Sequence, residues 1–92
     1  MDQMRISIKV IGDVHGVGFR FRTVETAQDL DLRGWVMNAS DGSVQIVAEG
    51  EKEKLAQLVQ WVKQGPSFAK VERVETSWEK ATSEFRGFEV RY

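Results

Sequence analysis

The first pattern along the chain is a strict alternation of apolar and polar side chains in RISIKVIG, residues 5–12. Successive side chains of a β-strand point to opposite faces of the sheet, so apolar residues at every second position indicate one buried face. The segment therefore predicts a strand whose buried residues are Ile6, Ile8 and Val10.

Two later segments repeat their apolar residues at helical spacing. Residues 21–31 predict an amphipathic helix, with Gly34 marking the break after it and an apolar stripe of Phe21, Val24, Ala27 and Leu30. Residues 51–66 predict a second helix, because one continuous stripe contains Leu55, Leu58, Val59 and Val62. Glu51 and Glu53 at its start and Lys63 near its end suit the helix dipole. Gly65 and Pro66 then predict the end of the helix.

The segment GWVMNASDGSVQIVAEG, residues 34–50, predicts a β-hairpin. One strand begins at Trp35, and the second has Val44, Ile46 and Ala48 on one face. Asp41-Gly42 lies between them and is typical of a turn, because glycine adopts positive φ freely.

Two segments near the C-terminal end of the sequence also carry strand patterns. In residues 69–78 the apolar phase shifts between Val71 and Val74, which predicts a β-bulge. Residues 86–92 alternate and predict a strand. The order strand, helix, strand, strand, helix, strand predicts a single α+β domain over residues 1–92 with the ferredoxin-like βαββαβ fold, a four-stranded antiparallel sheet with two helices on one face.

Composition narrows the function classes. The chain has 92 residues, a net charge of −1 and no cysteine, which excludes disulfides and thiolate chemistry. It shows no signal-peptide pattern and no apolar stretch of membrane-spanning length. We therefore expect a cytoplasmic protein, a monomer, with no membrane partner. The lack of a basic excess disfavours nucleic-acid binding. RGFEVRY at 86–92 has only a weak similarity to the aromatic signature of the RNA recognition motif.

The glycine-rich stretch GDVHGVGFRFR, residues 12–22, joins the first strand to the first helix. Successive backbone N–H groups in such a loop can form a concavity for an anion, and the helix N-terminus adds positive potential there. Arg20 follows, and a guanidinium can bind two phosphate oxygens in parallel. The stretch fits a phosphoryl cradle; its alternative is a common turn with a solvated arginine.

Two motifs resemble the signatures of the acylphosphatase family. VIGDVHGVGFR is similar to the first, G-x-V-Q-G-V-x-F-R, with His15 where glutamine is usual. GWVMNASDGSVQIVAEG is similar to the second at every characteristic position. The resemblance implies hydrolysis of an acyl phosphate to a carboxylate and inorganic phosphate, without metal or cofactor. It also implies that Arg20 binds the phosphate, that Asn38 positions the attacking water, and that loop amides assist Arg20: those of His15, Gly16, Val17, Gly18 and Phe19.

Other candidate groups have simpler interpretations. His15 is conceivable as a general base, but local hydrogen bonding in the loop is favoured. Asp13, Asp41 and Glu49 show no metal-ligand spacing, so we expect turn and surface roles for them. Trp61 is expected to be half-buried. The alternative function is a non-catalytic binding or regulatory module of the same fold, with an RNA or protein partner.

Overall fold

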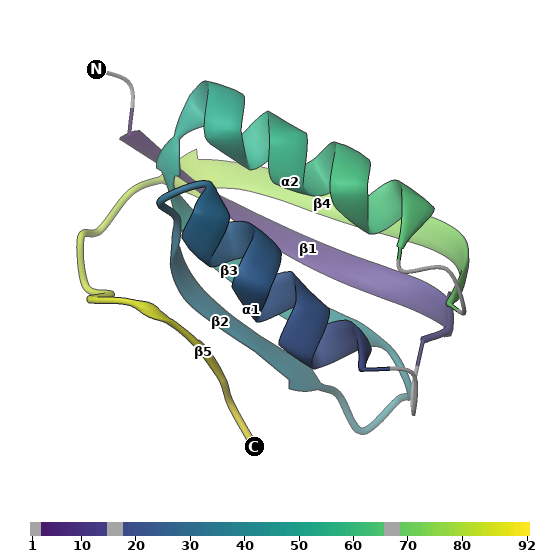
Figure 1. The fold of residues 1–92 in the computed structure, drawn as a ribbon. Coiled ribbons are helices and arrows are strands. Elements are labelled where there is room, and N and C mark those ends of the chain that lie inside the picture. Colours follow the sequence, from purple (N-terminus) through teal and green to yellow (C-terminus); the bar gives the residue numbers. More distant parts are fainter. Residues whose placement is uncertain (1–2, 15–17, 66–68) are drawn as a thin grey trace.

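Both helices cover one face of a single β-sheet (Figure 1). The computed structural model describes residues 3–14, 18–65 and 69–92. Within these residues five strands form the sheet in the order β4-β1-β3-β2-β5. The elements are β1 (Gln3–Asp13), α1 (Phe19–Asp29), β2 (Arg33–Asn38), β3 (Val44–Glu51), α2 (Lys52–Gln64), β4 (Lys70–Lys80) and β5 (Phe88–Val90).

The core lies between the helices and the sheet, where the alternating and helical patterns predict it. Strand β1 buries Ile6, Ile8 and Val10, and β3 buries Val44, Ile46 and Ala48, so both strand predictions are confirmed. Helix α2 buries the whole predicted stripe, namely Leu55, Leu58, Val59 and Val62. Each of these elements has a period that matches its geometry over several consecutive residues.

Helix α1 differs from its prediction at both ends and along its buried face. It begins at Phe19 and ends at Asp29, and the chain turns at Asp31, which has a φ of 58°. Gly34 does not mark the helix end, because it lies inside β2 opposite Ala48. The residues that α1 buries are Phe19, Thr23 and Ala27, whereas Phe21 is exposed. Of the predicted stripe, Ala27 is buried and Val24 and Leu30 pack against the core, so the prediction is wrong only at Phe21.

The α+β class with two helices on one face is confirmed, but the sheet has five strands instead of four. The long strand β4 pairs antiparallel with β1 at one edge. The predicted last strand is the short β5, which pairs parallel with β2 at the opposite edge. Because β4 already occupies the place beside β1, the chain crosses the sheet and adds β5 to the remaining edge.

The bulge predicted between Val71 and Val74 is present. Ile11 pairs with Arg73, whereas Gly12 pairs with Val71, so Glu72 is the extra residue on β4. The strands approach so closely here that a Cβ on Gly12 would lie 2.2 Å from the carbonyl oxygen of Lys70. A glycine at position 12 is therefore required where β1 passes the bulge and leads toward the loop before α1.

Glu49 is buried, which contradicts the expected surface role. Its side chain has 0% exposure on β3. The carboxylate accepts hydrogen bonds from Arg5 Nε at 2.7 Å, Thr82 N at 2.8 Å and Ser83 N at 2.9 Å. Hydrogen bonds to the buried Glu49 carboxylate thus hold the segment between β4 and β5 against the central strand of the sheet.

Candidate functional site

The N-terminus of α1 is an unneutralised positive helix end. Gly18 occupies the N-cap position with a left-handed φ of 73°, a conformation that glycine adopts without strain. Among the residues that the structure describes, no side chain caps this end, and the first turn contains no acidic residue. Backbone N–H groups at such an end are available to an anion. Of the five predicted loop residues, Gly18 and Phe19 lie here, whereas His15, Gly16 and Val17 lie outside the described residues.

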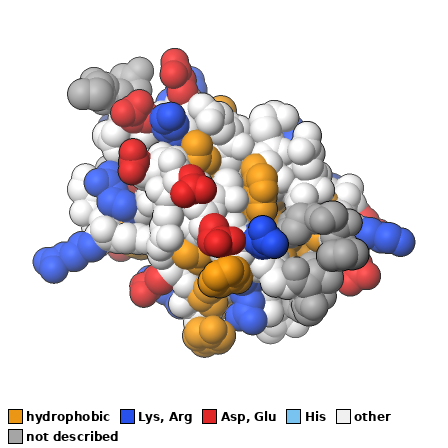
Figure 2. Space-filling view, in the orientation of Figure 1, with side chains coloured by type: hydrophobic (Ala, Val, Ile, Leu, Met, Phe, Trp, Pro, Cys, Tyr) orange, Lys and Arg blue, Asp and Glu red, His pale blue; other side chains and the backbone are white. Residues whose placement is uncertain are grey.

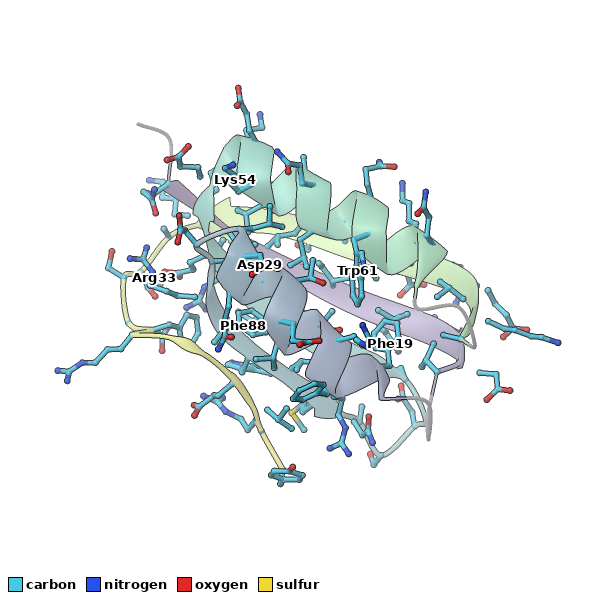
Figure 3. The ribbon with its side chains drawn as sticks, in the orientation of Figure 1. Phe19, Asp29, Arg33, Lys54, Trp61 and Phe88 are labelled. Atoms are coloured by element: carbon cyan, nitrogen blue, oxygen red, sulfur yellow. The ribbon has the colours of Figure 1, made fainter. Side chains whose placement is uncertain are left out.

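Phe19 anchors the first turn of α1 in the core. Its side chain is 2% exposed, and its ring centroid lies 5.8 Å from that of Trp61 on α2. Figure 3 shows both side chains between the two helices, near the end where α1 begins. The Thr23 hydroxyl donates a 2.8 Å hydrogen bond to the carbonyl oxygen of Phe19. These contacts fix the position from which the next residue, Arg20, projects. Trp61 is partly buried against the core, as predicted.

Arg20 projects from the first turn of α1 toward the end of the chain. Its guanidinium carbon lies 5.3 Å from the ring centroid of Tyr92, a cation–π geometry. Within residues 3–14, 18–65 and 69–92, the ion pairs engage other arginines and a lysine, and none involves Arg20. The guanidinium donors of Arg20 are thus held beside an aromatic ring and are not neutralised by a described carboxylate.

Asn38 is the last residue of β2 and is exposed. The register aligns it with Val44 of β3, which in turn pairs with Val10 of β1. Neighbouring strands are about 4.8 Å apart, so Asn38 lies roughly 10 Å across the sheet from Val10, near the end of β1. Asn38 follows Val36 by two residues in the strand, so both side chains point to the same face of the sheet. Val36 is buried under the helices. Its side chain therefore belongs to the face on which the loop enters α1.

The C-terminal segment brings Arg20 and Asn38 to the same end of the sheet. Val90 of β5 pairs in parallel with Val36 of β2, so Tyr92 and Asn38, each two residues further on, reach the same level. Arg20 contacts Tyr92. In Figure 1 the C-terminus lies near both the start of α1 and the end of β2. The sequence predicts Tyr92 only as part of the last strand, because its contact with Arg20 joins residues that are far apart along the chain.

The turn after Asn38 is stabilised by other residues. Asp41 Oδ1 accepts hydrogen bonds from the backbone N–H of Ser43 at 3.0 Å and from its hydroxyl at 2.6 Å. Asp41 Oδ2 lies 3.0 Å from Lys9 Nζ on β1. The hydrogen bonds from Ser43, together with the partner Lys9, hold the pKa of Asp41 well below its usual range. The predicted turn role of Asp41 is confirmed, and the Asn38 side chain makes none of these contacts.

The arrangement provides hydrogen-bond donors and positive potential for an anion, with a neutral amide nearby. In the described part of the chain, no three histidine, cysteine or acidic side chains gather into a metal-ligand group. The same residues include no helix long and apolar enough to cross a membrane.

Comparisons with known proteins agree with one another. A family model described as Acylphosphatase matches residues 6–90. An acylphosphatase from Salinibacter ruber is 46% identical over 89 residues, covering 97% of this chain and 94% of that protein. One from Pelotomaculum thermopropionicum is 40% identical over 92 residues, covering both chains completely. The crystal structure of acylphosphatase from Bacillus subtilis superposes with a TM-score of 0.93 at 36% identity, covering 97% of this chain and 99% of that one.

Proposed function

Because the chain belongs to the acylphosphatase family and hydrolyses acyl phosphates, we propose that Arg20 and the start of α1 bind the phosphoryl group while Asn38 orients water. One observation carries this proposal. Arg20 contacts Tyr92, and the pairing of β5 with β2 brings Tyr92 level with Asn38 at the end of β2. The family matches support the reaction, and the geometry supports the assignment of roles to these residues.

Arg20 is suited to the phosphoryl group for two reasons. Its planar guanidinium presents parallel N–H donors that match two phosphate oxygens. The neighbouring helix end adds the N–H groups of its first turn, and Gly18 lets the backbone approach an anion without a side chain in between. The loop amides of His15, Gly16 and Val17 complete the proposed cradle. The substitution of His15 for the usual glutamine leaves this function unchanged if that position contributes its backbone N–H.

Asn38 is suited to water. Its amide both donates and accepts hydrogen bonds, and it remains neutral, so it orients a water molecule without removing its proton. Its exposed position at the end of β2 leaves its side chain accessible to solvent. The Asp41 and Ser43 hydrogen bonds already stabilise the following turn, which frees Asn38 from that structural task.

The reaction needs little acid or base catalysis. The water oxygen forms a bond to phosphorus, and the bond from phosphorus to the acyl oxygen breaks. The carboxylate departs as a good leaving group, and both water protons end on the dihydrogen phosphate product. Phosphoryl transfer spreads negative charge over the equatorial oxygens, so positioning and positive potential supply most of the rate enhancement. We propose that Arg20 and the backbone donors supply them without a metal or cofactor.

The same proposal includes the setting of the enzyme. The substrate is a small-molecule acyl phosphate, and we propose a cytoplasmic monomer that uses no nucleic-acid partner. The rival RNA-binding interpretation lacks support in the sheet, since β3 carries no aromatic side chain on which a base could stack.

Steady-state kinetics with benzoyl phosphate, and inorganic phosphate as a competitive inhibitor, test the roles of both residues. Arg20→Ala should lose both turnover and phosphate affinity. Arg20→Lys should restore little of either, because an ammonium group cannot reproduce the parallel N–H donors of the guanidinium. Asn38→Ala should keep its phosphate affinity while kcat falls by about 10²–10³. Arg22→Ala and Ser40→Ala are matched controls, since both residues are exposed neighbours. Near-normal kcat in Asn38→Ala, or near-normal activity in Arg20→Lys, would contradict the assigned roles.

A further inference from the structure

Phe21 is a large aromatic side chain that the fold does not use. It follows Arg20 in the first turns of α1 and is 65% exposed, whereas the buried side of the helix is formed by Phe19, Thr23 and Ala27. A single exposed apolar residue is ordinary on a protein surface. A second exposed aromatic beside the same arginine, Tyr92 with 97% exposure, makes this position different.

The helix geometry places Phe21 on the side of α1 that borders β5. Gln28 Nε2 donates a 3.4 Å hydrogen bond to the carbonyl oxygen of Phe88 in β5, so the side of α1 that bears Gln28 borders this strand. Phe21 precedes Gln28 by seven residues, which is about two turns, so both side chains point in nearly the same direction. Phe21 therefore lies on the same border as Gln28.

The axial rise sets the level of Phe21 along β5. Seven helical residues span about 10 Å, and about three strand residues cover the same distance. Because Arg20 meets Tyr92 while Gln28 meets Phe88, the helix and the strand run in opposite directions. Moving back two turns from Gln28 therefore corresponds to moving forward from Phe88 to Arg91 or Tyr92. Phe21 thus comes level with Tyr92 along the border between α1 and β5.

We propose that Phe21 and Tyr92, the aromatic pair, bind the acyl group of the substrate and favour aromatic acyl phosphates over small aliphatic ones. This inference rests on the proposed role of Arg20, since the phosphoryl group bound there fixes where the acyl group extends. Only one bridging oxygen separates phosphorus from the acyl carbon, so the acyl group begins close to the phosphoryl group that Arg20 binds. Figure 2 shows hydrophobic side chains beside a basic one at the lower edge of this face, where α1 begins and the chain ends in Figure 1.

The chemistry of the pair favours a flat, apolar acyl group. Aromatic rings attract one another in offset-stacked or edge-to-face arrangements and gain further from the apolar area that they cover. A benzoyl ring is large enough to contact an exposed side chain such as Phe21, whereas an acetyl group ends at its first methyl. The aromatic pair therefore contributes to the binding of benzoyl phosphate and little to that of acetyl phosphate.

The test compares kcat/KM for benzoyl phosphate with kcat/KM for acetyl phosphate in Phe21→Ala and Phe21→Leu. We expect the benzoyl-to-acetyl ratio to fall about three- to tenfold in Phe21→Ala and less in Phe21→Leu. Rates with acetyl phosphate and the inhibition constant of inorganic phosphate should not change. Trp78→Ala is the matched control, because Trp78 is 40% exposed and lies on β4 at the opposite edge of the sheet. Thermal melting should show that all three variants are folded.

Two results would overturn the inference. In one, Phe21→Ala leaves kcat/KM unchanged for both substrates, and in the other it lowers both by the same factor; in either case the benzoyl-to-acetyl ratio does not change. Failure of the underlying role of Arg20 is recognised separately, because Arg20→Ala would then retain its affinity for inorganic phosphate whatever Phe21 does.

Discussion

Replacing Glu49 with glutamine should destabilise the protein, and the effect should depend on pH. The Glu49 carboxylate is completely buried, and both of its oxygens accept hydrogen bonds. Oε2 accepts from Arg5 Nε and from the backbone and hydroxyl of Thr82, and Oε1 accepts from Ser83 N. An amide at this position keeps the shape of the side chain but removes the negative charge and turns an NH₂ group toward donors.

The expected magnitude follows from the pKa of Glu49. Burial acts to raise this pKa, but the Thr82, Arg5 and Ser83 hydrogen bonds outweigh burial and lower it from an ordinary 4.5 to about 2. Each pKa unit corresponds to about 1.4 kcal/mol, so the ionised carboxylate stabilises the folded state by about 3 kcal/mol. Because the folded-state pKa is the lower one, this stabilisation is present above pH 4.5 and disappears as the pH falls toward 2.

Urea unfolding followed by tryptophan fluorescence measures the effect. At pH 7 we expect the free energy of unfolding of Glu49→Gln to be lower than that of the wild type by about 3 kcal/mol. The difference between the two proteins should shrink as the pH approaches 2. Glu89→Gln is the matched control, because Glu89 also lies on a strand but is exposed, and its effect should stay within about 0.5 kcal/mol.

A difference between Glu49→Gln and the wild type that is the same at pH 7 and near pH 2 would refute this reasoning. The loss would then come from altered packing and not from the charge. Near-equal stability at pH 7 would show that the hydrogen bonds do not compensate for burying the carboxylate, as happens in some buried ion pairs.

Two further predictions concern the chemistry and the strand that leads to the site. Hydrolysis of benzoyl phosphate should proceed at an unchanged rate in EDTA; loss of turnover that magnesium or zinc restores would contradict the metal-free mechanism. Gly12→Ala should lower the free energy of unfolding by at least about 2 kcal/mol, because its Cβ would lie 2.2 Å from the Lys70 carbonyl oxygen and 2.8 Å from Glu72 N. Gly87→Ala is its control, since a Cβ there meets nothing within 4 Å, and an equal loss in both variants would argue against the close approach at the bulge.

The sequence by itself determined the elements whose signals are local. Strand β1, strand β3 and helix α2 each repeat apolar residues at their own period, and each buries the residues that the period selects. The turn at Asp41-Gly42 and the bulge opposite Gly12 also leave local marks, because positive φ and a shift of phase appear in the residues themselves. The two signature-like motifs likewise identified Arg20 and Asn38 as candidates, which remain proposals.

Only the tertiary structure decided the features that depend on distant partners. Glu49 looks like a surface carboxylate until Arg5 and the segment at Thr82 and Ser83 close around it. Strand β5 joins β2 in parallel because β4 occupies the other edge, which a one-dimensional pattern does not record. The exposure of Phe21 and the contact between Arg20 and Tyr92 depend on how α1 is rotated over the sheet. Periodicity determines which residues share a face, but packing against the rest of the chain determines which face is buried.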